Sequence, residues 1–176
     1  GKTFEAVALA RDLLSNMKPR QQVLLLAHTN AATAEFRARL PNLTNTSVVV
    51  TTFDSFALEL LRAYAGALEL PARFRVGPAG PVPFADLTPK LNALLSGAPA
   101  IARHLAAHYP VLIADEHQDA SRDQHRLVTL LLDGGVARVR LFGDPMQSIY
   151  DFDGHLVAWN DVLAMGDTVI QLEEPW

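Results

Sequence analysis

Short, unbroken apolar runs alternate along the chain with longer amphipathic stretches. The unbroken runs at residues 23–27 and 111–114 are typical of strands buried on both faces of a parallel sheet, and further β-prone runs fall at residues 47–51, 139–142 and 168–172. The stretches between them carry apolar side chains at helical spacing, at residues 3–17, 30–40, 53–64, 121–132 and 155–164. We expect Asn30 to cap the helix that it opens. The alternation predicts βαβ units, and hence an α/β fold with helices on both faces of a parallel sheet.

One segment interrupts this alternation. Between residues 65 and 90 the chain holds eight glycines and prolines, which disfavour long regular elements. We interpret residues 65–107 as a short insertion of loops, closed by one or two helices over 90–107. The insertion divides the α/β domain into a first part, 1–64, and a second part, 108–176.

Composition narrows the class of protein. A chain of 176 residues with 49% hydrophobic residues suits one folded domain and excludes a disordered tail. The chain has no cysteine, so disulfides, thiolate zinc sites and cysteine nucleophiles are excluded. The longest apolar runs are far shorter than the roughly 20 residues of a membrane helix. We therefore expect a cytoplasmic protein that does not associate with a membrane.

The charged residues are unevenly distributed. The net charge of −4, taken alone, argues against a protein that holds nucleic acid by charge. Residues 1–114 carry 11 Lys and Arg against 7 Asp and Glu, whereas residues 115–176 carry 4 against 12. The first two thirds of the chain are therefore basic, and the acidic excess lies in the last third.

Polar clusters follow the predicted strands, at residues 28–30, 51–52, 115–116 and 143–144. In parallel α/β sheets, ligands bind at the carboxyl ends of the strands. We therefore expect these clusters to form a site along that edge of the sheet.

Two of the motifs fit nucleotide chemistry. Gly1-Lys2-Thr3 opens a predicted helix and has the form of the end of a P-loop, in which helix N–H groups and Lys hold phosphate and the Thr hydroxyl binds Mg²⁺. Asp115 and Glu116 follow a buried strand, and an NTPase needs one acid for Mg²⁺ and another for the attacking water. Alternatively, the two acids begin a helix, where the helix dipole favours negative charge.

A third cluster is the segment GDPMQSIY at residues 143–150. The amide of Gln147 could hydrogen-bond a γ-phosphate and report its loss on hydrolysis. The alternative is a plain turn, because Gly-Asp-Pro favours one.

Five segments resemble motifs of UvrD/Rep-type superfamily 1 helicases, in the order of that family. Residues 115–119 (DEHQD) and 143–150 resemble motifs II and III, which usually read DExQD and GDxxQSIY. Residues 25–40 resemble motif Ia, 51–57 (TTFDSFA) the TFHSFA element, and 172–176 (LEEPW) the start of motif IV. With the Lys-Thr pair in front, the resemblance covers nearly the whole chain. It implies a P-loop NTPase fold of the RecA-like kind.

The resemblance implies ATP and Mg²⁺ as cofactors. Thr3 and Asp115 match residues that hold Mg²⁺, and Glu116 matches the base that activates the attacking water. Gln147 matches the glutamine that senses the γ-phosphate, and Trp176 stands where a Tyr usually stacks on the nucleotide base. The residues implied to bind the nucleotide are Gly1, Lys2, Thr3, Gln147 and Trp176, and those implied in catalysis are Lys2, Glu116 and Gln147.

The resemblance also implies single-stranded DNA as a partner. His28 and Phe152 match aromatic residues that stack on bases, and stacking holds single strands whatever their sequence. Asn30, Thr52 and Ser55 fall in segments that the resemblance places close to the DNA strand.

Three residues depart from the family pattern. Asp153 stands where Arg is common, Asp54 replaces the usual His, and Pro175 replaces an Asn. The insertion is also shorter than is usual in the family. We therefore expect the ATP chemistry to be more nearly intact than the DNA contacts.

Together these patterns predict the first motor domain of an ATP-dependent DNA helicase or translocase, excerpted from a longer protein. The family completes its site with arginines from motif IV and from a second motor domain. Residues 1–176 alone should therefore hydrolyse ATP negligibly and unwind nothing. Three alternatives stay open: the motor subunit of a helicase-nuclease, a regulatory module that binds ATP without hydrolysing it, and an α/β domain that binds no nucleotide.

Overall fold

Parallel strands form the centre of the molecule. The structure is a computed structural model that describes residues 2–14, 17–41, 43, 47–70, 74, 76–77, 82–147, 155–166 and 168–170. Its strands are β1 (Val23–Ala27), β2 (Val48–Thr52), β3 (Val111–Ala114) and β4 (Arg138–Leu141). They form one parallel sheet in the order β2-β1-β3-β4. The predicted α/β fold with a parallel sheet is confirmed.

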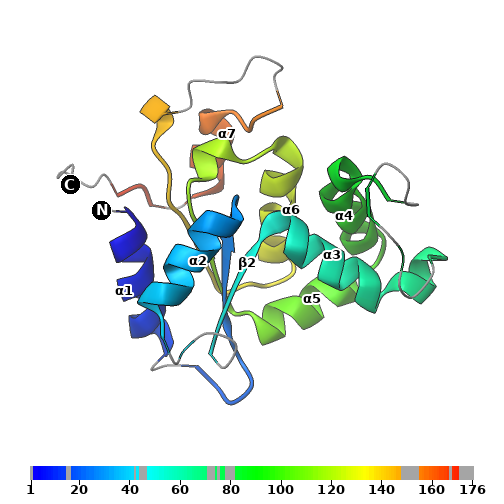
Figure 1. Cartoon of the computed structure of the whole chain (residues 1–176), viewed down its shortest axis with the longest axis horizontal. Helices are drawn as coiled ribbons and strands as arrows, with labels where there is room; N and C mark the ends of the chain where they lie inside the picture. Colours follow the sequence, from blue (N-terminus) through cyan, green and yellow to red (C-terminus); the bar gives the residue numbers. More distant parts are fainter. Residues whose placement is uncertain are drawn as a thin grey trace.

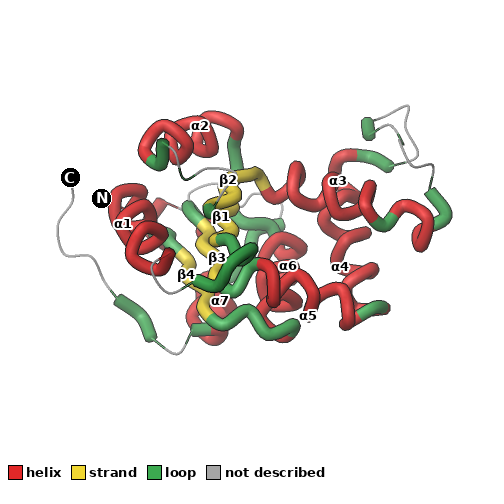
Figure 2. Tube along the Cα trace, turned by 90° about the horizontal axis from the view of Figure 1, so that it is seen from below, coloured by secondary structure: helices red, strands yellow, loops and turns green. Residues whose placement is uncertain are grey.

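Helices cover both faces of the sheet, as the alternating pattern predicts. Figure 2 shows α1 (Lys2–Leu14) and α2 (Asn30–Arg39) on one side, and α3 (Phe53–Ala63), α4 (Leu87–Gly97), α5 (Pro99–His108) and α6 (Arg122–Asp133) on the other. A further helix, α7 (Trp159–Met165), packs on Leu141 of β4. The 3₁₀ turns are η1 (Ala65–Leu68), η2 (Phe84–Asp86), η3 (His117–Asp119) and η4 (Pro145–Gln147). None of the described helices is long and apolar enough to cross a membrane.

Strand β1 contributes to two hydrophobic cores. Val23 and Leu25 pack in the core under α1 and α2, whereas Leu24 and Leu26 pack in the larger core under α3 to α6. Successive side chains of a strand point to opposite faces, and both faces here are covered. Every residue of β1 is therefore buried, which explains the unbroken apolar run in the sequence.

The helices of the predicted insertion pack on the main domain. Leu91 of α4 lies in the core that also holds Leu24 of β1. Nδ2 of Asn92 donates a hydrogen bond to the carbonyl of Asp123, at the start of α6, at 2.9 Å. These contacts hold α4 against α6, and α6 is the α-helix that follows the Asp-Glu pair. The predicted division of the domain into three parts stays a prediction.

The cap of α2 differs from the prediction. Oγ1 of Thr29 accepts a hydrogen bond from the N–H of Ala32 at 3.1 Å, and Thr29 has an extended backbone (φ −129°). Asn30 is already the first helical residue, so the prediction that Asn30 caps this helix is wrong. A cap residue keeps non-helical dihedral angles, and Thr29 is the residue that does so.

Two predicted elements near the C-terminus are also corrected. Helix α7 begins at Trp159 rather than at residue 155, because residues 155–157 run extended beside the segment before α6. There the N–H of Val157 donates to the carbonyl of Ala120 at 2.9 Å. The strand predicted at 168–172 is wrong for its described residues, 168–170, which are exposed and belong to no strand. A β-prone sequence does not form a strand without a partner edge.

Candidate functional site at the carboxyl edge of the sheet

The polar clusters predicted from the sequence meet at one edge of the sheet. Strand pairing sets Ala27 opposite Thr52 and Leu26 opposite Ala114, so the clusters after β1, β2 and β3 begin at one level. Strand β4 ends at the same level, with Leu141 opposite Ala114. In Figure 1 the N-terminal end of α1 also lies at this end of the sheet. The expectation of a site along the carboxyl edge therefore agrees with the geometry.

Asp115 and Glu116 leave β3 in a sharp turn. The N–H of Asp115 donates to the carbonyl of Leu26 at 3.1 Å, and Asp115 is only 4% exposed. Glu116 adopts the left-handed conformation (φ 48°, ψ 44°), which costs a residue with a side chain about 1–2 kcal/mol and is concentrated at functional sites. The next α-helix begins only at Arg122, after its cap Ser121. The alternative in which the two acids begin that helix is therefore wrong.

Side-chain hydrogen bonds connect Glu116 to the segment that follows β4. Nε2 of Gln118 donates to Oε2 of Glu116 at 2.9 Å, and Oε1 of Gln118 accepts from the N–H of Asp144 at 3.0 Å. Oδ2 of Asp144 in turn accepts from Nε2 of Gln147 at 2.9 Å. Glu116 and Gln147, two of the residues predicted to act in catalysis, are thus joined through Gln118 and Asp144.

Backbone hydrogen bonds hold the same two segments together. The N–H of Phe142 donates to the carbonyl of Ala114 at 2.8 Å, and the N–H of His117 donates to the carbonyl of Phe142 at 2.7 Å. The pairing of β3 with β4 therefore continues past the ends of both strands. It fixes the backbone on which Glu116 and Gln118 stand.

Gln118 is a residue of the site to which the sequence analysis assigned no role. It stands inside the segment that resembles motif II, and Asp144 stands inside the one that resembles motif III, so both positions were visible in the sequence. Their hydrogen bond joins residues 26 apart, however, and no sequence periodicity encodes such a contact. The signal available from the sequence was therefore the motif pattern alone.

The structure describes part of the predicted nucleotide-binding residues. Helix α1 begins at Lys2, which fits the prediction that the Lys-Thr pair opens a helix. The side chains of Lys2 and Thr3 are not described, and Gly1, Phe152 and Trp176 lie outside the described residues.

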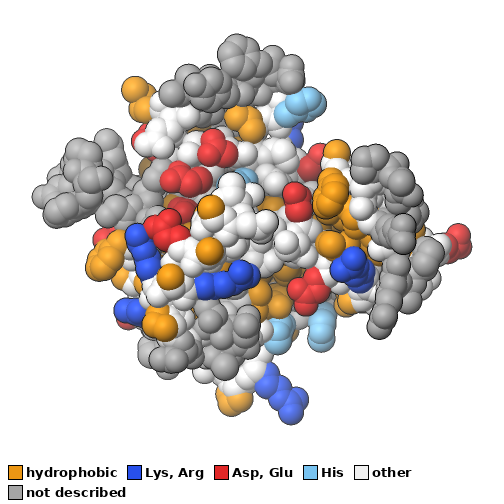
Figure 3. Space-filling view, viewed as in Figure 1, with side chains coloured by type: hydrophobic (Ala, Val, Ile, Leu, Met, Phe, Trp, Pro, Cys, Tyr) orange, Lys and Arg blue, Asp and Glu red, His pale blue; other side chains and the backbone are white. Residues whose placement is uncertain are grey.

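Acidic side chains gather where the strands end. Figure 3 shows several Asp and Glu side chains over this edge, while Lys and Arg on the same face lie mostly toward the opposite end. The side chains of Asp115 and Glu116 offer oxygen atoms as metal ligands, the type that Mg²⁺ prefers. Nucleotide sites usually hold Mg²⁺ with one or two carboxylates together with phosphate oxygens. The described residues contain no group of three His, Asp or Glu that forms a metal site by itself. The residues present therefore fit Mg²⁺ brought with a nucleotide.

His28 lies at this edge but faces inward. Its ring lies 5.1 Å from the ring of Phe53, tilted by 34°, and its Nε2 is buried. Burial lowers the pKa of His28, although the negative charges of Asp119 and Glu116 oppose the shift. The ring is therefore neutral at pH 7, and it already stacks on a protein side chain.

The other predicted DNA-contact residues that the structure describes lie at the starts of α2 and α3. Asn30 is exposed in the first turn of α2. Thr52 caps α3, since its Oγ1 accepts from the N–H of Ser55 at 3.1 Å and donates to Oγ of Ser55 at 2.8 Å. Thr52 and Ser55 therefore have a structural role as well as a place at the site.

A second histidine lies deeper, behind Phe53. His117 is fully buried, and its Nε2 lies 3.1 Å from Nδ1 of His125 on α6. Burial, with a smaller contribution from His125 and His28, lowers the pKa of His117 to about 3. His117 therefore stays neutral across the physiological range and links the turn after β3 to α6.

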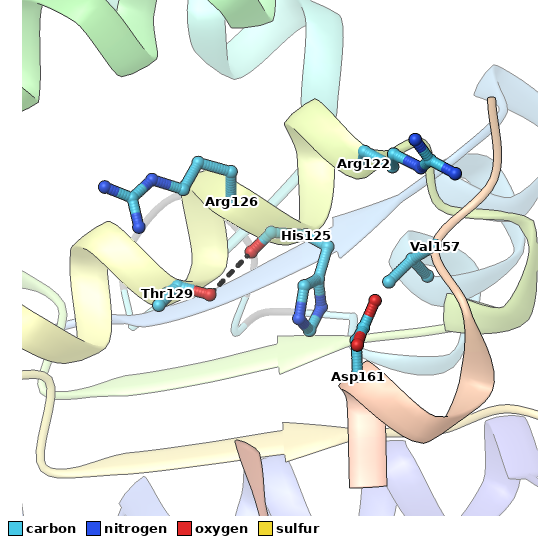
Figure 4. Close-up of a pocket in the computed structure, with 6 residues that line it drawn as sticks. All are labelled: Arg122, His125, Arg126, Thr129, Val157 and Asp161. Atoms are coloured by element: carbon cyan, nitrogen blue, oxygen red, sulfur yellow. Dashed lines mark hydrogen bonds between the residues drawn. The ribbon is translucent and has the colours of Figure 1, made fainter. Parts of the chain in front are cut away.

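A hollow of about 300 Å³ lies between α6 and α7 (Figure 4). His125, the partner of His117, is one of the residues that line it. Figure 4 shows the ring of His125 pointing toward Asp161, while Arg122 and Arg126 extend away from each other. Because the two guanidinium groups do not converge, the hollow does not form a phosphate site. Its lining residues are Arg122, His125, Arg126, Thr129, Val157 and Asp161.

The fold and the site together define a class of protein. A parallel α/β sheet, a helix that begins at a Lys-Thr pair, and an Asp-Glu pair after a buried inner strand are the features of a P-loop NTPase with a RecA-like fold. The family model of the UvrD/REP helicase N-terminal domain matches residues 1–78 and 78–158. The chain belongs to this family, as its motifs predict. No curated protein matches the chain.

Family membership indicates a helicase motor that acts on DNA. Domains of this family generally use ATP and Mg²⁺.

Proposed function

We propose that the chain is the first motor domain of an ATP-dependent DNA helicase or translocase. It binds and hydrolyses ATP with Mg²⁺ and moves on single-stranded DNA. The observation that carries the proposal is the Asp115–Glu116 pair at the end of β3, with the carboxylate of Glu116 held by Gln118 at 2.9 Å. Membership of the UvrD/REP family supports the same function.

Different residues at the carboxyl edge perform different tasks in the proposed hydrolysis of ATP. Gly1, Lys2 and the N-terminus of α1 bind the phosphates, because free N–H groups at a helix start attract anions. Glu116 accepts a proton from the attacking water as general base. Gln147 hydrogen-bonds the γ-phosphate, and Trp176 stacks on the nucleotide base.

The metal site in this proposal is made of oxygen donors. Thr3 and Asp115 hold Mg²⁺, whose positive charge neutralises the phosphate oxygens. Asp115 suits this role because it is almost fully buried at the end of β3, where its N–H is hydrogen-bonded to the carbonyl of Leu26. Glu116, the next residue, has a left-handed backbone. Its carboxylate is then available to activate the attacking water.

The DNA strand crosses the same edge in this proposal. His28 and Phe152 stack on bases, each contact worth about 1–3 kcal/mol, and Asn30, Thr52 and Ser55 lie near the phosphates. His28 lies at the end of β1, at the same edge as the starts of α2 and α3, and this placement supports the path although its ring also packs on Phe53.

A second motor domain of the same protein completes the site. Transition-state arginines of such motors come from outside the first domain. We therefore expect residues 1–176 alone to hydrolyse ATP negligibly.

The experiment compares the full-length protein with its Glu116→Gln variant. We expect ATP turnover to fall by at least about 100-fold in the variant, because an amide cannot accept the proton of the attacking water, while nucleotide binding is kept. Glu59→Gln, at an exposed glutamate of α3, is the matched control and should leave turnover unchanged. Turnover by Glu116→Gln at the wild-type rate would contradict the assignment. Binding without turnover in the wild type would instead favour a regulatory ATP-binding module.

A further inference from the structure

Gln118 uses both ends of its side-chain amide. It is 3% exposed, and its Nε2 donates to Oε2 of Glu116 at 2.9 Å while its Oε1 accepts from the N–H of Asp144 at 3.0 Å. A second contact of Nε2, to Oδ2 of Asp119, is longer at 3.5 Å. One buried side chain therefore bridges the turn after β3 and the turn after β4.

The partners of Gln118 fix the orientation of its amide. A carboxylate oxygen can only accept, and a backbone N–H can only donate. If the amide were turned over, its NH₂ group would face the N–H of Asp144 and its oxygen would face the Glu116 carboxylate. Both hydrogen bonds would be lost, so Gln118 has one favourable orientation, and that orientation holds Glu116.

The backbone beneath Gln118 is also held. The N–H of Asp119 donates to the carbonyl of Glu116 at 2.9 Å, and the N–H of Ala120 donates to the carbonyl of His117 at 3.1 Å. These bonds close the 3₁₀ turn η3 directly after the left-handed Glu116. A buried side chain on a closed turn has little freedom, so the position of the Glu116 carboxylate depends on that of Asp144 through the two hydrogen bonds of Gln118.

Asp144 organises the segment on the other side of the bridge. Its Oδ1 accepts from the N–H of Met146 at 3.0 Å, and its Oδ2 accepts from Nε2 of Gln147 at 2.9 Å. Gly143 allows the close approach: a Cβ there would lie 3.1 Å from Oε1 of Gln118. The connection therefore runs from Gln147 through Asp144 and Gln118 to Glu116.

We propose that Gln118 is a positioning residue, which holds the carboxylate of Glu116 toward the attacking water and ties it to the segment that carries Gln147. The inference rests on the proposed ATP hydrolysis by this site. The side-chain hydrogen bonds of Gln118 go to Glu116, Asp119 and Asp144. Its effect on turnover is exerted through Glu116.

Two substitutions in the full-length protein separate the two ends of the amide. Gln118→Leu removes both hydrogen bonds at similar size. Gln118→Glu keeps an oxygen for the N–H of Asp144, but it can no longer donate to Glu116 and sets two carboxylates against each other. The control is Gln124→Leu, because Gln124 also accepts a backbone N–H, that of Ser121 at 3.0 Å, but belongs to the cap of α6.

Steady-state ATP turnover and amide hydrogen exchange at Asp144 are the two measurements. We expect kcat to fall about tenfold or more in both Gln118 variants, with KM for ATP within about twofold of wild type, because a displaced catalytic group costs turnover more than binding. Exchange at Asp144 should quicken in Gln118→Leu and stay slow in Gln118→Glu. Gln124→Leu should lower Tm but change neither kcat nor exchange at Asp144.

The outcomes distinguish this inference from the function on which it rests. If the wild type turns over ATP, and Gln118→Leu keeps kcat within about twofold or loses no more than Gln124→Leu, the positioning role is wrong and the proposed function stands. Unchanged exchange at Asp144 in Gln118→Leu would also overturn it. If the wild type does not hydrolyse ATP at all, both proposals fail together.

Discussion

His117 is fully buried one residue after Glu116, and its burial has a cost that depends on pH. Burial, with His125 and His28 adding to it, lowers the pKa of His117 to about 3, whereas a histidine in an unfolded chain titrates near pH 6.5. Between these values only the unfolded state takes up a proton. The free energy of unfolding therefore falls as the pH drops from about 6.5 toward 3, and above that window His117 contributes no pH dependence.

Replacing His117 by Phe tests this at the residue scale. A phenyl ring keeps the packing beside Phe53 but takes up no proton, so the loss of stability between pH 7 and pH 5 should shrink by about 2 kcal/mol. Urea unfolding at the two pH values measures the change. The exposed His104 provides the control, since His104→Gln should keep the wild-type difference. An unaltered difference in His117→Phe would show that His117 is not the group responsible.

For single residues, the sequence predicted the positions that belong to a recognisable motif. The position of Asp115 and Glu116 at the end of a buried strand could be predicted, because they follow an unbroken apolar run, while their roles in catalysis stay predictions. Thr29 caps α2 in place of the predicted Asn30. Both residue types favour a cap position, and the backbone angle that makes Thr29 the cap is not determined by residue type. Gln118 was missed because its partner, Asp144, is brought near by the pairing of β3 with β4.

At the scale of elements, the end of β4 and the start of α7 meet at Gly143. A Cβ at this position would lie 2.8 Å from Cη2 of Trp159 and 3.1 Å from Oε1 of Gln118. Neither neighbour is free to retreat, because Gln118 is buried and hydrogen-bonded at both ends and Trp159 packs with Val157 and Val162.

We therefore expect Gly143→Ala to destabilise the protein by about 1–3 kcal/mol, the usual cost of overpacking. Thermal or urea unfolding measures it. The double variant Gly143→Ala/Trp159→Leu should recover part of the loss, since the smaller side chain makes room. Gly97→Ala is the control, because a Cβ at Gly97 meets nothing within 4 Å. A Gly143→Ala protein as stable as Gly97→Ala would contradict the close packing around Gly143.

Elements with strong periodicity were predicted well, and those that depend on a neighbour were not. Strand β1 could be predicted because both of its faces are covered and every residue is apolar. The residues before α7 have a helical pattern, yet they run extended because Val157 bonds to Ala120. The segment 168–170 has a β-prone sequence and forms no strand, since no described strand pairs with it.

At the scale of the whole molecule, the order β2-β1-β3-β4 explains why distant motifs form one site. Parallel strands all end at the same edge, so motif-like segments separated by many residues become neighbours. Net charge alone was a poor guide, because Asp115, Glu116 and Asp144 of the acidic last third lie at this edge, where Figure 3 shows several acidic side chains. Acids that would hold Mg²⁺ and a catalytic water do not exclude DNA from the rest of the surface.

The central claim is that this chain belongs to a motor driven along single-stranded DNA by ATP hydrolysis at Glu116. Displacement of streptavidin from biotin at either end of a single-stranded oligonucleotide tests it most directly, with the full-length protein and its Glu116→Gln variant. We expect the wild type to displace streptavidin from one end in the presence of ATP and Mg²⁺, and the variant to displace it from neither. Displacement by the variant at the wild-type rate, or ATP turnover in the wild type without displacement from either end, would contradict the account.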